Sequence, residues 1–217
     1  MKRGLTKAWR EYKVFALFMF LMIIFRSALA DWNVVPTGSM KPTILEGDRI
    51  LVNKLAYDLK IPLTHVSIYQ FGDPKRGDIV IFDSKLADTR LVKRVIGLPG
   101  DIVEMRDNRL VINGIEAGYS NVEHAADAIL AIESYPGMSH RIELSQAGPG
   151  RLSSFQPVNV PEGHYLVLGD NRDNSADSRV YGFIPRDEII GNAKTVVLSL
   201  NYDHYYVPRA DRFFHAL

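Results

Sequence analysis

An unbroken apolar run near the N-terminus constrains this chain more than any other feature of its sequence. The run covers Val14–Phe25 and follows a basic head, residues 1–13, with five lysines and arginines against one glutamate. A membrane-spanning helix needs roughly 20 apolar residues, or ~17 at the low end. The segment 14–30 reaches that lower limit if Arg26 extends its guanidinium to the far interface. Membrane insertion is therefore the first question that the sequence raises.

Three interpretations of this run are open from the residues alone. A cleaved signal peptide fits the basic head, the apolar stretch and the A-x-A pattern of Ala28-Leu29-Ala30. An uncleaved anchor fits equally well. A buried core helix fits poorly, because the run is apolar on every side. In the first two cases the basic head stays in the cytoplasm and the rest of the chain is exported, following the positive-inside bias.

Composition and charge narrow the class of protein. The 217 residues suffice for one sizeable core with a smaller inserted lobe. The formal net charge is +1 and no basic stripe with interleaved aromatics appears, so nothing predicts binding to nucleic acid. The absence of cysteine excludes a disulfide framework, a thiolate nucleophile and a Cys-ligated metal site.

Short runs rich in Val, Ile and Leu, broken by Gly and Pro, dominate the chain beyond Asp48. Such runs are typical of antiparallel strands, and the pair Asn113-Gly114 predicts a tight hairpin turn. The best helix candidate is Val122–Ile132. The strand candidates are RILVNKLAY, GDIVIF, RLVKRVIGL, DIVEM, RLVINGI, HYLVLGD and KTVVLSLNY.

Residues 119–157 differ from their surroundings, being rich in Ala, Ser, Gly and Gln without a strong strand signal. We interpret them as an inserted lobe. The main β domain is then formed by residues 31–118 and 158–217.

The stretch VVPTGSMKPTI, Val34–Ile44, places Ser39 between two prolines, Pro36 and Pro42. Prolines limit the backbone states of this segment, and Gly38 leaves space for another backbone to approach. Ser39 is either a turn residue or a nucleophile.

A nucleophilic serine here needs a base, and the GxSxG elbow is absent. A neutral lysine can serve, although a lysine normally titrates near 10.4 and must be desolvated to lose its proton at lower pH. Lys93 shares a predicted strand face with Leu91 and Val95, where such desolvation is plausible. The alternative is that Lys93 and Arg94 form a solvated pair at a strand edge.

A polar stretch, GDNRDNSADSRVYGFIP or Gly169–Pro185, follows the apolar run HYLVLGD. Its side chains predict a loop held by its own hydrogen bonds. Asp177 and Arg179 are spaced to form an ion pair, and Ser175 can offer its hydroxyl to an amine. A calcium loop is not predicted, because Arg172 falls on a ligand position of the EF-hand pattern.

The histidines show no spacing that supports a metal site. We expect them to be surface or hydrogen-bonded residues, although a Ser-His-Asp triad remains open because its members need not be close in sequence. They are His65, His124, His140, His164, His204 and His215.

Taken in order, four stretches resemble the type I signal peptidases, the membrane-bound Ser-Lys endopeptidases that remove signal peptides. They begin just after the apolar segment and read PTGSMKPTILEGDRILVNK, RGDIVIF, RLVKRVIGLPGDIVE and GDNRDNSADSRVYGFIP. The resemblance implies that Ser39 is the nucleophile and Lys93 the general base. Thr37 stands where the family often has a serine, whose hydroxyl joins the nucleophile's N–H in the oxyanion hole.

The resemblance also implies roles for residues around this pair. Ser175 matches the residue that orients the lysine amine, and Asp177 and Arg179 match a structural pair behind the site. The positions that would line the shallow apolar substrate pockets are Val35, Pro36, Met40, Ile44, Leu91 and Val92.

Fold, substrate and location follow from the same resemblance. It implies a mostly β protein: an antiparallel β-sheet catalytic domain with an inserted smaller lobe and one N-terminal transmembrane helix. The partners would be the lipid bilayer and the signal peptides of exported preproteins, cleaved after small residues at −1 and −3. No cofactor or metal is implied. An uncleaved single-pass anchor over residues 14–30 is favoured, in the plasma (inner) membrane with the catalytic domain on the outer, periplasmic side.

Two other functions compete with this one. A self-cleaving repressor-type Ser-Lys protease shares the expected fold, but it needs a DNA-binding helix-turn-helix that the basic head and the apolar run cannot supply. A non-enzymatic, membrane-tethered β domain would carry the same motifs as relics. Against it, each position needed for the chemistry holds a competent residue.

Overall fold

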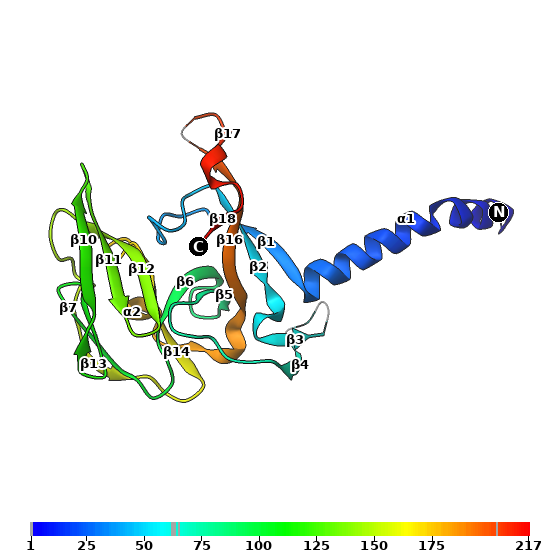
Figure 1. Cartoon of the computed structure of the whole chain (residues 1–217). Helices are drawn as coiled ribbons and strands as arrows, with labels where there is room; N and C mark the ends of the chain where they lie inside the picture. The colour runs from blue at the N-terminus through cyan, green and yellow to red at the C-terminus, as the bar shows by residue number, and fades with distance from the viewer. Residues whose placement is uncertain (1, 62–63, 65, 203) are drawn as a thin grey trace.

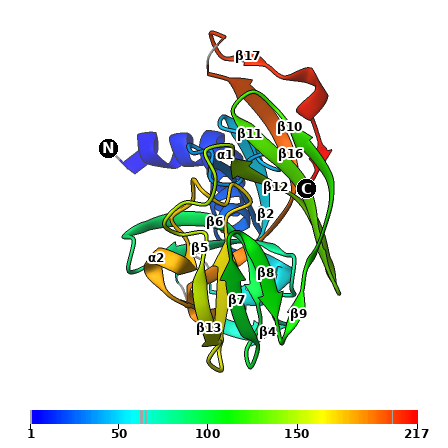
Figure 2. The same ribbon diagram turned by 90° about the vertical axis from the view of Figure 1, so that its left-hand side faces the viewer.

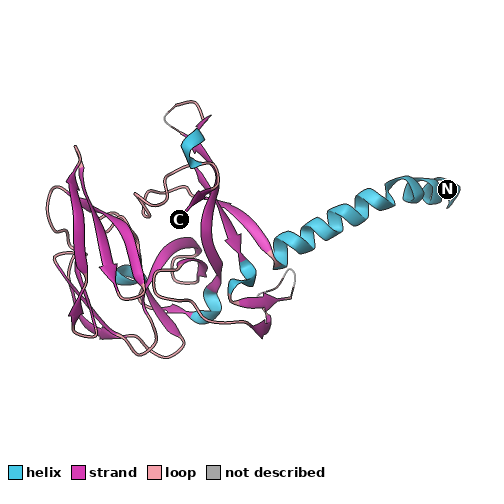
Figure 3. Cartoon of the chain, in the orientation of Figure 1, coloured by secondary structure: helices cyan, strands magenta, loops and turns pink. Residues whose placement is uncertain are grey.

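A long helix, α1 (Lys2–Ala28), projects from a body built almost entirely of strands (Figures 1 and 3). This computed structural model describes residues 2–61, 64, 66–202 and 204–217. His65 lies outside the described residues. The predicted mostly β, antiparallel fold is confirmed by the strand pairing that follows.

Helix α1 contains the apolar run. The large apolar side chains between Val14 and Ile23 are mostly exposed. Among the described residues, no helix is both long enough and apolar enough to qualify as a membrane span. The predicted transmembrane helix over residues 14–30 is therefore not confirmed.

The junction between α1 and the body is fixed by hydrogen bonds from the backbone and the side chain of Lys54. The Lys54 backbone N–H donates to the Leu29 carbonyl at 3.0 Å, and Lys54 Nζ donates to the carbonyls of Arg26 and Ser27 at 2.8 and 3.1 Å. Ala30 already pairs with Asn53 in the first strand ladder. The segment Ala28-Leu29-Ala30 thus passes directly from helix into sheet.

Among the described residues, the main sheet has nine strands, and every neighbouring pair in it is antiparallel. Its order is β1-β2-β16-β5-β6-β14-β15, and β17 and β18 also pair with β16. The strands are β1 (Ala30–Val34), β2 (Asp48–Asn53), β5 (Ile79–Ser84), β6 (Thr89–Gly97), β14 (His164–Leu168), β15 (Ile184–Pro185), β16 (Ile189–Asn201), β17 (Val207–Pro208) and β18 (His215–Ala216).

Strand β5 shows why this sheet forms. Its run of Val, Ile and Phe is buried on both faces, as expected for a strand in the middle of a covered sheet. Ile79 and Ile81 pack into one apolar cluster, whereas Val80 and Phe82 pack into another. The alternation of period two thus divides the core between the two faces of the sheet.

Two smaller sheets form a second group of strands on the side of the body away from α1 (Figures 1 and 2). One has the order β13-β7-β8-β9 and the other β10-β11-β12. Their strands are β7 (Ile102–Arg106), β8 (Arg109–Ile112), β9 (Ile115–Glu116), β10 (Gly118–His124), β11 (Ala128–Tyr135), β12 (Met138–Ser145) and β13 (Phe155–Asn159).

Short elements complete the fold. In the part of the chain that the structure describes, they are the two-stranded sheet of β3 (Asp58–Lys60) and β4 (Ser67–Gln70), the helix α2 (Ser178–Tyr181) and the 3-10 turns η1 (Lys54–Ala56), η2 (Arg186–Glu188) and η3 (Ala210–Arg212).

The second strand group corrects one prediction and confirms another. The predicted helix Val122–Ile132 is wrong: this segment forms the end of β10, a turn and the start of β11, which pairs with neighbours along both edges. The turn at Asn113-Gly114 is confirmed, because both residues have positive φ (52° and 79°) and connect β8 to β9.

The lobe limits 119–157 stay a prediction, but strand pairing reaches further. Strand β13 pairs with β7, and β7 pairs with β8. The second strand group therefore begins near Ile102 rather than at Tyr119.

Gly97, the last residue of β6, marks a point of close approach between the main sheet and the second group. A Cβ at this position would lie 2.9 Å from Val103 Cγ2 and 3.0 Å from both Leu166 Cβ and Val160 Cγ2. We predict that Gly97→Ala lowers the free energy of unfolding by about 1–3 kcal/mol, because these neighbours must shift. Chemical denaturation measures the change. The control is Gly72→Ala, where an added Cβ meets no atom within 4 Å; an equal loss in both variants would contradict the prediction.

Candidate active site

Ser39 lies in the turn that connects β1 to β2. The Lys41 N–H donates to the Gly38 carbonyl at 3.0 Å, and the Ile44 N–H donates to the Met40 carbonyl at 2.9 Å. Ser39 itself is half-buried, and its carbonyl accepts from the Asn171 N–H at 3.1 Å. The turn predicted from the prolines is therefore also tied to the loop that follows β14.

Lys93 on β6 meets this turn. Its Nζ lies 2.7 Å from Ser39 Oγ, within hydrogen-bonding distance, although 54 positions separate the two residues. Lys93 is only 3% exposed. Strand β6 runs between β5 and β14, so Lys93 is not part of a solvated strand edge.

Burial shifts the protonation of this amine. Loss of water lowers the pKa of Lys93 to about 8, against the opposing attraction of the Asp177 and Asp170 carboxylates. The nearby Arg179 guanidinium pushes the pKa in the same direction as burial. A substantial fraction of the amine is thus neutral at mildly alkaline pH and able to accept a proton.

A groove of about 320 Å³ opens beside the pair. One wall comes from the end of β1 and the turn, and the other from the first half of β6. Its walls include five of the predicted pocket residues, Val35, Pro36, Met40, Leu91 and Val92, together with Thr37, the predicted oxyanion-hole residue, and Asn33, Val34, Thr89 and Arg90.

Ile44 departs from the prediction for this groove. It is fully buried, packs in the core cluster with Met40 and Ile50, and does not line the groove. Its place four residues after Met40, where the turn folds back, aims it into the core. Ile44 therefore supports the wall from beneath instead of contacting a ligand.

The predicted pair behind the site is present. Arg179 and Asp177 form a buried ion pair at 2.7 Å. Asp177 Oδ2 also accepts from the Gly169 N–H at 3.0 Å, and Arg179 donates to the Leu152 carbonyl at 2.9 Å. The pair thus fixes the backbone where β14 ends.

Ser175 lies close to the backbone of Ser39 but does not make the predicted contact with Lys93. A Cβ built on Gly169 would be 2.3 Å from Ser175 Oγ and 2.4 Å from the Ser39 carbonyl oxygen, so all three groups crowd one spot. Within the described part of the chain, the buried Ser175 hydroxyl has no hydrogen-bond partner. The predicted hydrogen bond to the Lys93 amine is therefore not formed in this structure.

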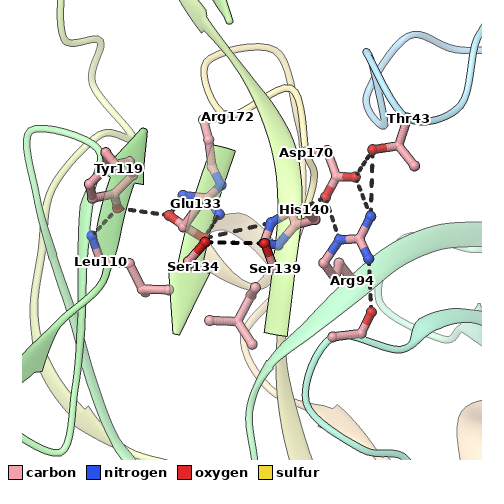
Figure 4. Close-up of polar contacts among 12 residues, drawn as sticks. Thr43, Arg94, Leu110, Tyr119, Glu133, Ser134, Ser139, His140, Asp170 and Arg172 are labelled. Carbon is pink, nitrogen blue, oxygen red and sulfur yellow. Dashed lines mark hydrogen bonds and ion pairs between the residues drawn. The ribbon is translucent and has the colours of Figure 1, made fainter. Parts of the chain in front are cut away.

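Sequence reasoning missed two residues of the same loop, Asp170 and Asn171. Asp170 accepts from Arg94 at 2.8 and 2.6 Å and from the Thr43 hydroxyl at 2.5 Å (Figure 4). Asn171 Nδ2 donates to the Gly38 carbonyl at 3.2 Å and to Glu143 at 3.0 Å. The density of polar residues predicted a bonded loop, but nothing local in the sequence indicates which distant group each side chain meets.

The remaining candidate chemistry is not assembled. Among the described residues, no group of three His, Asp or Glu side chains is arranged to hold a metal ion. The histidines His124 and His204 are exposed as expected, whereas His140 is buried. The side chain that hydrogen-bonds to Ser39 Oγ is Lys93 and not one of these histidines.

Comparison with known proteins places these residues in a family context. The family model described as "Signal peptidase, peptidase S26" matches residues 8–198. The signal peptidase I of Pseudomonas fluorescens is 36% identical over 215 residues, an alignment that covers 87% of this chain and 72% of that protein. Signal peptidase I T of Bacillus subtilis is 34% identical over 198 residues, covering 90% and 89%.

A crystal structure of a signal peptidase I from Enterococcus faecalis V583 is also similar in sequence. It is 33% identical and covers 56% of this chain and 97% of that chain, with a TM-score of 0.37.

Proposed function

The chain belongs to the signal peptidase I family, peptidase S26, and on that premise we propose that it removes signal peptides from exported preproteins with Ser39 and Lys93 as its catalytic pair. The observation that carries the proposal is the 2.7 Å separation between Ser39 Oγ and an almost fully buried lysine amine. A serine peptidase requires a base at that distance.

In the proposed reaction, the neutral amine of Lys93 accepts the hydroxyl proton as Ser39 Oγ attacks the scissile carbonyl carbon. The oxyanion of the tetrahedral intermediate receives hydrogen bonds from the Ser39 N–H and the Thr37 hydroxyl. The Lys93 ammonium then donates its proton to the leaving amine, and the C–N bond breaks to give an acyl-enzyme. The regenerated amine takes a proton from water as the water oxygen attacks the ester carbonyl carbon. The Lys93 ammonium then returns that proton to Ser39 Oγ as the ester C–O bond breaks, and the new carboxyl group loses its own proton to solvent.

The groove supports an extended substrate. A polypeptide lying between the end of β1 and β6 would place its scissile carbonyl near Ser39 and its preceding side chains against Val35, Leu91 and Val92. The groove is apolar and small, which fits the proposed preference for small residues at −1 and −3.

Three supporting residues are assigned more indirect roles. Asp177 and Arg179 brace the Gly169 backbone, which crowds the carbonyl of Ser39. Ser175 is assigned to the lysine amine on different grounds: its buried hydroxyl lies beside the Ser39 carbonyl and has no hydrogen-bond partner among the described residues.

We also propose that α1 holds the enzyme at a lipid bilayer, with the basic head in the cytoplasm and the catalytic body outside. The apolar side chains of α1 favour this assignment. Those between Val14 and Ile23 are exposed in the structure, and a bilayer would cover them. The short distance in sequence from Ala28 to Ser39 would then keep the nucleophile close to emerging signal peptides.

Two single substitutions test the catalytic pair. We predict that Ser39→Ala and Lys93→Ala each lower the rate of preprotein cleavage at least about a thousandfold, because either change removes the nucleophile or its base. Cleavage of a purified preprotein by the full chain in detergent measures the loss. Ser120→Ala and Lys194→Ala, both at exposed positions, serve as controls. Retained cleavage in either catalytic variant would rule out the mechanism.

The pH dependence of cleavage tests the state of the amine. Because only neutral Lys93 accepts a proton, we predict that kcat/KM rises with pH through a midpoint near 8. Bound substrate excludes more water and disfavours the ammonium further, so the midpoint of the kcat profile should lie below that of kcat/KM. A kcat/KM profile that stays flat from pH 6 to 10 would contradict a titrating base.

The bilayer proposal is tested with the full chain in membranes. We expect the protein to stay in the membrane pellet after alkaline carbonate extraction, and a variant with Phe18→Asp and Leu21→Asp to be released. Both positions are exposed on α1. Ile115→Asp, an exposed change on the second strand group, is the control and should stay with the pellet. Release of the unchanged chain from the membrane pellet by carbonate would contradict the proposal.

A further inference from the structure

Among the histidines that the structure describes, His140 on β12 is buried between charged groups and has no role in the proposed reaction. Its side chain is 4% exposed, and Nε2 lies 3.6 Å from Glu133 Oε1 and 3.7 Å from Asp170 Oδ1. Within the described residues, neither ring nitrogen has a hydrogen-bond partner. Figure 4 shows the imidazole between the two carboxylates.

Each of these carboxylates belongs to its own buried ion pair. Glu133 on β11 binds Arg172 in a two-pronged pair and accepts from the Tyr119 hydroxyl at 2.7 Å. Asp170 binds Arg94. His140 therefore stands at the junction between a charge cluster of the second strand group and one of the main sheet.

The Asp170 cluster reaches both members of the catalytic pair through few bonds. Arg94 is the residue after Lys93 on β6, and Thr43, which donates to Asp170, lies four positions after Ser39. Asn171, the residue after Asp170, donates its N–H to the Ser39 carbonyl. A displacement of Asp170 would thus disturb the turn that carries Ser39 and the strand that carries Lys93.

The chemistry of the ring suits a link between two carboxylates. Carboxylates only accept, so the ring proton belongs on Nε2, which faces both of them. At 3.6–3.7 Å this is a shared dipolar contact and not a full hydrogen bond to either oxygen. The charged groups around the ring are Glu133 on β11, Arg94 on β6, and Asp170 and Arg172 in the loop after β14; burial lowers the pKa of His140 to about 4, so the ring is neutral at neutral pH.

We propose that His140 is a positioning residue for catalysis: its Nε2–H, shared between Glu133 and Asp170, couples the β10–β12 sheet to the loop that sets the Ser39–Lys93 geometry. This inference rests on the proposed function, since it takes Ser39 and Lys93 as the reacting groups. It assigns the second strand group a part in catalysis without any contact with substrate.

Three substitutions at this position separate positioning from packing. In His140→Gln the side-chain amide reaches the place of Nε2 and keeps a donor there. In His140→Asn the amide falls at the place of Nδ1, and His140→Leu removes the donor altogether. The control is His124→Leu, at an exposed position of β10 in the same strand group.

We expect Leu and Asn at position 140 to lower kcat about tenfold or more, with KM within about twofold, because misplacement of reacting groups acts on the chemical step and not on the groove. Gln should restore kcat to within about threefold of the unchanged protein, and His124→Leu should leave both constants unchanged. Steady-state cleavage by the full chain, at a temperature well below each variant's melting point, measures these values.

The proposal is overturned if Asn and Leu keep kcat within about twofold, or if Gln loses as much as Asn. Should the Leu variant fail to fold, the comparison of Gln with Asn decides alone. Failure of the catalytic assignment itself would look different: Ser39→Ala or Lys93→Ala would then retain cleavage, whatever happens at position 140.

Discussion

The contact between a buried amine and a serine hydroxyl is the constraint around which this molecule is organised. Transfer of an ammonium group into an apolar interior costs free energy. The rest of the fold must offset that cost, because the main sheet buries Lys93 on β6. Strand β5 on one side and β14 on the other remove its neighbours from water, and the β1–β2 turn brings Ser39 to within 2.7 Å. The same burial that costs stability lowers the pKa of the amine, as the proposed mechanism requires of a base.

The loop after β14 is where the parts of the structure are joined. Its three aspartates meet different partners: Asp170 pairs with Arg94, Asp173 accepts from the Ser145 N–H, and Asp177 pairs with Arg179. One segment thus contacts the main sheet, the second strand group and its own helix α2. The neighbouring Asn171 donates its N–H to the Ser39 carbonyl, so the same loop also holds the turn between β1 and β2.

The sequence predicted the parts of this structure that have local causes. Alternating Val and Ile runs predicted the strands, and Asn113-Gly114 predicted a hairpin turn, since both depend on neighbouring residues alone. An Ala-rich segment misled the assignment of Val122–Ile132, where pairing along two edges outweighs helix propensity. The residues alone left open whether Lys93 is solvated. Its pairing with Ser39 was predicted only from the family resemblance. Asp170 and Asn171 escaped notice because their partners are distant in sequence. His140 was expected at the surface or in a hydrogen bond, but it is buried without a hydrogen-bond partner among the described residues. Ile44 was misplaced because it packs in the core.

The entry into β1 has a consequence for the enzyme's own chain. Ala28-Leu29-Ala30 carries small residues in the spacing that the groove is proposed to accept. Yet Ala30 pairs with Asn53, and Lys54 binds three carbonyl groups around this segment. This segment would have to lose its pairing with β2 before it could bind as a substrate strand beside Ser39. If the enzyme cleaves after small residues as proposed, the pairing of β1 with β2 would hinder cleavage of its own chain at Ala28-Leu29-Ala30.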